Sequence, residues 1–271
     1  MHTVFCDGYA KPEDYVLKAI ELNMKSIGFS GHAPLHFPND WAMKEEKLED
    51  YVNELIRLKN KYKNDIPIYI GIEADYIPGV VTDANEIKKK YNLDYIIGSI
   101  HLVGKDDINN LWFIDGPIED FDEGIKKLFN NDVKKAVEAY FKQTIEMINF
   151  YKPDIIGHLD KIKINNKNRF FNEEEDWYKE LVYELIDCIV KNDVIIEINT
   201  RGIYKKKVAE PFPSFWIIKY ASEKGAKFII NSDTHKPDEI IMEFDNVYNN
   251  VKNLGINKLY NRVKNKWEIC S

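Results

Sequence analysis

Short apolar runs alternate with longer amphipathic stretches along most of the chain. Each run ends in a polar or glycine-containing corner, and the stretch after it carries apolar residues at helical spacing. The short runs predict buried strands at residues 3–5, 26–29, 66–72, 95–98, 155–157, 194–198 and 228–231. The amphipathic stretches predict helices at residues 13–22, 45–61, 83–90, 133–150, 173–190 and 214–223.

Strands that alternate with helices indicate a parallel sheet in an α/β protein. Seven such strands, with no linker rich in proline, glycine or serine, favour a single domain over residues 1–271, built as a barrel of βα units. An open doubly wound sheet is the alternative, and either fold binds ligands beyond the carboxyl ends of its strands. Residues 102–124 are less regular and suggest a loop that folds over something.

Charge and composition narrow the class of protein. The net charge of −7 offers no basic field for nucleic acid. The three cysteines are widely spaced and form no CxxC pair, which fits a reducing compartment. No apolar run reaches membrane-spanning length, and the first residues lack the pattern of a signal peptide. We therefore expect a cytoplasmic protein that binds neither nucleic acid nor membrane.

Histidines and carboxylates gather where the predicted strands end. Eight of these side chains share that position: His2, Asp7, His32, Glu73, His101, His158, Asp233 and His235. The carboxyl ends of parallel strands point the same way, so we expect the eight to converge on one rim. Imidazole and carboxylate together suit Zn, Mn or Fe. Because a four-coordinate zinc uses only four ligands, eight candidates predict more than one metal.

Metals that lie close together suit phosphoryl chemistry, since they clamp the attacking and leaving oxygens and lower the pKa of a bound water. A barrel with scattered, unrelated histidines is the plainer alternative. The remaining histidine, His36, lies between Pro34 and Pro38, and these prolines argue against a helical pair with His32. We interpret His36 as a loop residue that could touch a substrate.

Six motifs follow one another along the chain: HTVFCDG at residues 2–8, FSGHAP at 29–34, GIEADY at 71–76, GSIH at 98–101, GHLD at 157–160 and NSDTH at 231–235. Their order and spacing resemble those of the polymerase and histidinol phosphatase (PHP) family. Two further segments, EINTRG at 197–202 and EPFPS at 210–214, resemble the histidinol-phosphatase branch. Each motif alone is weak, but six in order over nearly the whole chain are specific.

The resemblance implies a distorted (β/α)7 TIM-like barrel with a trinuclear centre. Carried over by motif, the ligands form three groups, of which the first two share Glu73 as a bridge: His2, Glu73 and Asp233; Glu73, His101 and His158; Asp7, His32 and His235. It implies hydrolysis of L-histidinol phosphate, in histidine biosynthesis, by a metal-bridging hydroxide. Three of the ligands, Asp233, His235 and His32, are the expected catalytic residues.

One departure concerns the first motif. The family begins with His-x-His, and His2 matches its second histidine, so the first would precede Met1. Either the chain lacks this ligand or the natural product begins a few residues earlier. We favour the second reading, because a strand cut off at its own ligand is an odd design.

Cations and further carboxylates are expected to recognise the substrate. Arg201 can bind a phosphate bidentately, and Lys163 is a second candidate. We interpret Glu197 as a structural carboxylate near the rim. The candidates for the substrate's amino group and imidazole are Glu210, Asp115 and Trp112.

Two other functions stay open at this point. The chain could be a PHP phosphoesterase or nuclease with another substrate, although its net acidity argues against nucleic acid. It could also be a metal-binding protein that has lost activity, which only the missing first histidine supports. The sequence does not determine the native metal or the oligomeric state.

Overall fold

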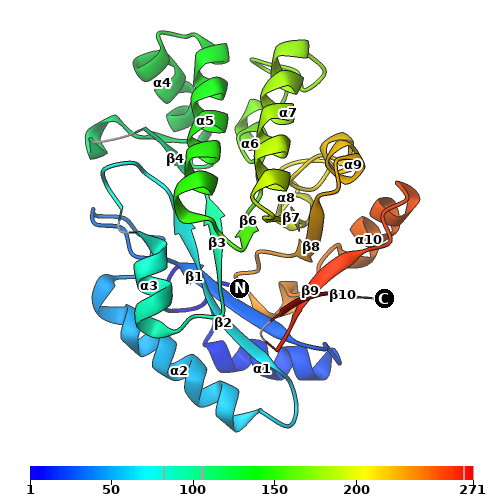
Figure 1. Cartoon of the computed structure of the whole chain (residues 1–271). Helices are drawn as coiled ribbons and strands as arrows, with labels where there is room; N and C mark the ends of the chain where they lie inside the picture. The colour runs from blue at the N-terminus through cyan, green and yellow to red at the C-terminus, as the bar shows by residue number, and fades with distance from the viewer. Residues whose placement is uncertain (82, 105–106, 265, 271) are drawn as a thin grey trace.

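A computed structural model describes residues 1–81, 83–104, 107–264 and 266–270. At its centre is a curled parallel sheet with helices on its outer side (Figure 1). The six strands follow the order β1-β2-β3-β6-β7-β8. Their bounds are β1 Ile27–His32, β2 Ile68–Asp75, β3 Tyr95–Ser99, β6 Ile155–Ile156, β7 Ile195–Asn199 and β8 Lys227–Asn231. All neighbours in this sheet pair in parallel, as the alternation of strands and helices predicts.

Helices connect the strands and cover the outside of the sheet (Figure 1). The helices are α1 Pro12–Glu21, α2 Leu48–Lys61, α3 Ala84–Tyr91, α4 Ile118–Phe129, α5 Val133–Tyr151, α6 Lys163–Asn166, α7 Asp176–Lys191, α8 Arg201–Tyr204, α9 Phe215–Glu223 and α10 Phe244–Asn253. Three 3-10 turns add η1 Glu45–Lys47, η2 Ile108–Asn110 and η3 Pro237–Glu239. The six predicted helices are all present. The sequence did not predict α4, α6, α8 or α10.

The predicted strand at residues 3–5 is wrong. Residues 4–7 form a turn, in which the Thr3 carbonyl accepts the N–H groups of Cys6 and Gly8 at 2.9 and 3.0 Å. Before the turn, the Met1 carbonyl accepts the N–H of Ser30 in β1 at 3.2 Å. The chain leaves the sheet after two residues, because this turn bonds the backbone groups that a strand would have offered to its neighbours.

The sheet therefore has six strands in the described part of the chain, where a (β/α)7 barrel would have seven. Its outermost strands, β1 and β8, are not hydrogen-bonded to each other, so the sheet is a curled half-barrel. A cavity of about 370 Å³ lies between these strands and is lined by Met1, Ile27 and Ile229, among others. The α/β class and the parallel order are confirmed, but the count of seven strands is not.

Apolar side chains form one large cluster between helices and sheet and a smaller one inside the curl. The inner cluster includes Tyr69 and Tyr95, which stand near the amino ends of β2 and β3. Tyr260 and Trp267 pack against it. They belong to a C-terminal hairpin of β9 (Leu259–Val263) and β10 (Lys266–Cys270), which the sequence did not predict. The hairpin covers the end of the curl opposite the strands' carboxyl ends.

The irregular region predicted at residues 102–124 contains a second hairpin, of β4 (Leu102–Val103) and β5 (Trp112–Phe113), and the start of α4. Residues 105 and 106 of this region lie outside the described residues. The Phe113 ring stacks on Trp41 at a centroid distance of 5.1 Å. The hairpin therefore packs on the connection that follows β1. Among the residues described, no helix combines the length and apolar character that a membrane crossing requires.

Candidate metal centre

The eight predicted ligands meet at the carboxyl ends of the parallel strands. His32 is the last residue of β1 and pairs in register with Glu73 of β2. The others follow β3, β6 and β8 or lie in the N-terminal turn. Asp7 and Asp233 are half-buried, whereas the other six are buried. The sheet thus gathers residues that are up to 233 positions apart, since His2 and His235 are both members.

The first group consists of His2, Glu73 and Asp233, whose ligand atoms lie within 4.8 Å of one another. The Nε2 atom of His2 is 3.2 Å from Oε2 of Glu73 and 3.1 Å from Oδ1 of Asp233. Asp233 adopts a positive φ of 48°, a conformation that costs energy for a non-glycine residue. The fold therefore holds Asp233 in a left-handed backbone conformation with its carboxylate against His2.

The second group consists of Glu73, His101 and His158. Oε1 of Glu73 is 3.1 Å from Nε2 of His158 and 3.7 Å from Nε2 of His101. Its other oxygen belongs to the first group, so Glu73 lies between the two groups, as a bridging ligand must. Ser99 donates a hydrogen bond of 2.6 Å to Oε1 of Glu73 and fixes that carboxylate.

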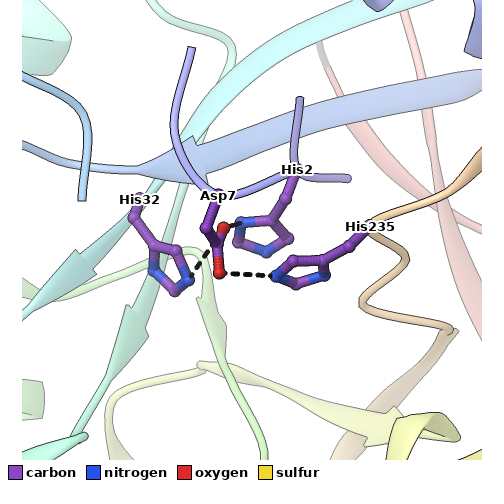
Figure 2. A group of neighbouring side chains, drawn as sticks. All are labelled: His2, Asp7, His32 and His235. Carbon is purple, nitrogen blue, oxygen red and sulfur yellow. Dashed lines mark hydrogen bonds and ion pairs between the residues drawn. The ribbon is translucent and has the colours of Figure 1, made fainter. Parts of the chain in front are cut away.

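The third group contains Asp7, His32 and His235, together with His2 (Figure 2). Asp7 is central: Oδ2 lies 3.1 Å from Nε2 of His235, and Oδ1 lies 3.9 Å from Nε2 of His32. The rings of His2 and His235 stack with centroids 4.2 Å apart. The expected set of three is therefore present and is extended by His2.

Electrostatics in the cluster favour ionised carboxylates. Burial alone would raise the pKa of Glu73, but the imidazoles of His32 and His158 outweigh it and hold that pKa well below its usual range. Burial and the charge of His2 lower the pKa of His32 to about 3. Burial would also lower the pKa of His2, but its bond to Asp233 is the main contact that raises that pKa well above the usual value.

The donor set fits divalent cations. Two buried atoms that face other members of the cluster, Oδ1 of Asp7 and Nδ1 of His32, have no hydrogen-bond partner among the described residues. A buried polar atom without a partner is costly, and ligation would satisfy it. Imidazole nitrogens and carboxylate oxygens are the donors that Zn, Mn and Fe share.

The two predicted phosphate ligands are in different surroundings. Arg201 begins α8 directly after β7, and its Nη1 donates to the carbonyl of Asp233 at 2.8 Å, which fixes the guanidinium beside the cluster. The ammonium of Lys163 donates to Asp160 at 2.7 Å, to the Pro211 carbonyl at 3.0 Å and to the Ser214 hydroxyl. These bonds use all three of its donors. Lys163 therefore joins the segment after β6 to the segment before α9, and none of these three bonds involves one of the eight clustered side chains.

A different lysine lies near the centre, and the sequence analysis missed it. Lys161 is buried and forms an ion pair of 2.8 Å with Asp115. Burial would lower its pKa, but Asp115 first, then Asp233 and Glu73, raise the pKa to about 12. It follows the GHLD motif directly, and that position was the only signal available.

The three residues predicted to bind the substrate's amino group and imidazole also differ in their surroundings. Trp112 is in the core, where its Nε1 donates to the Phe121 carbonyl at 3.0 Å, so it is not available to a ligand. Glu210 accepts the N–H of Phe215 at the start of α9. Asp115 is available to a ligand, because its Oδ1 is buried and has no hydrogen-bond partner within the described part of the chain.

Two other residues lie as predicted. Glu197 is buried and accepts the backbone N–H of His158 at 2.9 Å, together with side-chain bonds from two asparagines of β7 and β8. This is the structural role expected for it. His36 is on an exposed loop, 3.7 Å from Glu45, and is not part of any ligand group. The histidine expected before Met1 stays a prediction.

Comparison with known proteins places this geometry in a family. A Deinococcus radiodurans protein named "Probable histidinol-phosphatase" is 27% identical over 261 residues, which cover 94% of this chain and 92% of that protein. A Listeria monocytogenes crystal structure, named provisionally as a histidinol phosphatase, matches with a TM-score of 0.79 and 25% identity over 90% of this chain and 97% of that one.

A histidinol phosphate phosphatase from Lactococcus lactis, solved with zinc, L-histidinol and phosphate, matches with a TM-score of 0.68. Its identity is 18%, with 99% of this chain and 97% of that chain covered, so this likeness concerns the fold. The profile of the PHP domain matches residues 1–201, which hold six of the eight clustered ligands. On that match, the chain belongs to the PHP domain family.

Proposed function

We propose that the protein is a metal-dependent phosphomonoesterase that hydrolyses L-histidinol phosphate to L-histidinol and phosphate. One observation carries the proposal: eight imidazole and carboxylate side chains converge in three overlapping groups, with Glu73 shared between two of them. The substrate is supported by the names of the Deinococcus and Listeria proteins, which match at least 90% of this chain.

Two or three divalent ions of Zn, Mn or Fe would occupy the centre. The first group is His2, Glu73 and Asp233, the second is Glu73, His101 and His158, and the third is Asp7, His32 and His235. Bound there, such ions supply a water whose pKa falls toward neutrality and positive charge that offsets the phosphoryl oxygens.

Asp233, His235 and His32 are the proposed catalytic residues. Oδ1 of Asp233 is 3.8 Å from Nδ1 of His235, and that nitrogen is 3.0 Å from the backbone carbonyl of Asp233, so the two residues are held side by side in the cluster. Burial and the charge of His2 lower the pKa of both His32 and His235, which keeps these two imidazoles neutral, the form in which they can bind a cation. Of the three, Asp233 carries the carboxylate that could accept a proton from the attacking water, directly or through one further water.

Two cations and one carboxylate are proposed to recognise the rest of the substrate. Arg201 beside Asp233 and Lys161 beside Asp115 would neutralise the phosphate. Arg201 offers a planar fork and Lys161 a point charge. The free Oδ1 of Asp115 would accept a hydrogen bond from the substrate's amino group.

The test is a substrate panel on the metal-loaded protein, comparing L-histidinol phosphate with nucleoside monophosphates, p-nitrophenyl phosphate and a single-stranded oligonucleotide. We expect kcat/KM for L-histidinol phosphate to exceed that for the others by at least about 100-fold, since charged and polar contacts to the amine and imidazole would be lost. Equal turnover of all the monoesters would contradict the assigned substrate. Cleavage of the oligonucleotide alone would support a nuclease instead.

A further inference from the structure

Asp75 is a buried carboxylate at the edge of the centre that none of the three proposed ligand groups uses. It is the last residue of β2, two positions beyond Glu73. Because side chains alternate along a strand, Asp75 and Glu73 lie on the same face of β2. Asp75 pairs in register with Ser99 of β3, and His101 follows Ser99 by two residues.

Asp75 contacts His101 in three ways. Both of its carboxylate oxygens lie 3.0 Å from Nδ1 of the His101 ring. Its Oδ1 also accepts the backbone N–H of His101 at 2.9 Å. A carboxylate can only accept, so these contacts require a hydrogen on Nδ1, and in the neutral ring they leave Nε2 as the nitrogen with the lone pair.

That orientation matches the second ligand group. Nε2 of His101 is 3.7 Å from Oε1 of Glu73, on the side where His158 also approaches Glu73. Nδ1 of His158, by contrast, has no partner in the described part of the chain. Of the two imidazoles in this group, only His101 therefore has a carboxylate behind it.

We propose that Asp75 is a positioning residue that fixes the tautomer and ring orientation of His101, so that Nε2 faces the metal. Metal-binding histidines commonly donate their second ring N–H to a carboxylate, which orients the ring and makes it a better ligand. The inference rests on the metal centre of the proposed function and does not depend on its substrate.

A competing role is direct ligation. Asp75, His32 and His101 also have ligand atoms within 4.8 Å of one another. The bond from the His101 backbone to Oδ1 argues for the positioning role, because that oxygen is already held by the residue it orients. The two roles predict different metal contents. Replacing a ligand removes a metal ion from the centre, whereas replacing an orienting residue only lowers the affinity for that ion.

The experiment measures zinc binding to the full chain for the wild type, Asp75→Asn and Asp75→Ala. Stoichiometry at saturating zinc comes from elemental analysis, and affinity comes from competition with a chelator. We expect both variants to bind the full complement of zinc with about 10–100-fold weaker affinity. In protein labelled with 15N-histidine, the downfield ring N–H signal of His101 should be present in the wild type and absent from Asp75→Ala.

Tyr151→Phe is the matched control. The Tyr151 hydroxyl donates to the backbone carbonyl of Asp75 at 3.2 Å, so its removal disturbs the same strand end and leaves the Asp75 carboxylate in the chain. It should leave zinc affinity and the His101 signal unchanged. If Asp75→Ala does not fold, Asp75→Asn keeps the test, because it preserves the shape of the side chain.

Two results would overturn the inference. A zinc affinity in Asp75→Asn within twofold of the wild type would remove the positioning role. Loss of one zinc per chain at saturation would make Asp75 a ligand. A wild type that binds zinc tightly and shows the His101 signal but does not hydrolyse L-histidinol phosphate would leave this inference standing and would refute the proposed function.

Discussion

At the residue scale, the chemistry of this protein rests on where single side chains fall relative to strand ends. His158 illustrates this, since it follows β6 directly and has a positive φ of 24° that the bond from its backbone N–H to Glu197 stabilises. Its ring lies 3.1 Å from Glu73. A strained residue held in this way at a site is typical of a functional position.

Replacing His158 with alanine should remove at least one metal ion per chain, because the second ligand group would keep only two members. His36→Ala is the control, since His36 is a histidine of the same chain outside every ligand group. Elemental analysis after dialysis measures both. Unchanged metal content in His158→Ala would refute its role as a ligand.

Replacing Arg201 with glutamine should lower kcat/KM for L-histidinol phosphate by about 10–100-fold, which corresponds to a charged hydrogen bond of about 1.5–3 kcal/mol. Metal content should not change, because Arg201 is not a ligand. Steady-state kinetics and elemental analysis check this prediction together. A variant with wild-type kcat/KM would show that the phosphate does not contact Arg201.

Metal binding should release protons at neutral pH. Burial would lower the pKa of His101, but the charge of Asp75 outweighs it and raises that pKa to about 9, and the pKa of His2 is also raised. Both rings are therefore protonated in the metal-free site at pH 7 and must lose a proton to bind a cation. Zinc affinity should rise with pH as these rings lose their protons, which for His101 is centred at about pH 9. Calorimetry in buffers of different ionisation enthalpy measures the release, and none at pH 7 would contradict this prediction.

At the element scale, the hairpin of β4 and β5 gives Trp112 a structural role and not a substrate-binding one. Trp112 in β5 was a candidate for contact with the substrate, but its ring is enclosed by Phe121 and Phe129 and its N–H is bonded. A β-carbon added at Gly124 would lie 2.0 Å from the Trp112 ring, which shows how closely α4 packs there.

Trp112→Phe should therefore lower the free energy of unfolding by about 1–3 kcal/mol, through a lost buried hydrogen bond and a cavity. The KM for L-histidinol phosphate should stay within twofold of the wild-type value. Denaturant unfolding and steady-state kinetics test the two parts separately. A large rise in KM with unchanged stability would restore Trp112 to the substrate site.

Some features of the structure could be predicted from the sequence and others could not. Apolar runs such as the one in β2 are buried along their whole length and stand out from their surroundings. The run at residues 3–5 is also largely apolar, but hydrogen bonds to the Thr3 carbonyl turn the chain there. Lys163 could not be assigned from sequence either, because its partners Pro211 and Ser214 become neighbours only in the folded chain. Asp75 lies within the GIEADY motif and Lys161 directly after GHLD, but neither position indicates from sequence alone which partner the side chain contacts.

At the scale of the whole molecule, the centre links the two ends of the sheet. Its ligands come from the N-terminal turn, from β1 and β2 and from the segment after β8, while β1 and β8 are not bonded to each other. Cations that bind these side chains would join the edges of the half-barrel. Metal binding and global stability should therefore be coupled, since the unfolded chain cannot gather these ligands.

Removal of metal should lower Tm by on the order of 10 °C relative to protein with metal at about a thousandfold excess over Kd, which is worth about 4 kcal/mol per site. Calorimetric scans of apo and zinc-loaded protein measure the difference. His36→Ala should show the same shift as the wild type. An identical Tm with and without metal would mean that the eight side chains do not act as ligands.

The most direct measurement is a titration of metal-free protein with Zn or Mn in which bound metal and the rate of L-histidinol phosphate hydrolysis are followed in the same samples. We predict no activity in the metal-free protein and a rise that is complete at two or three ions per chain. Full activity with no metal, or saturation of the eight-residue cluster by metal without any hydrolysis, would contradict the proposal.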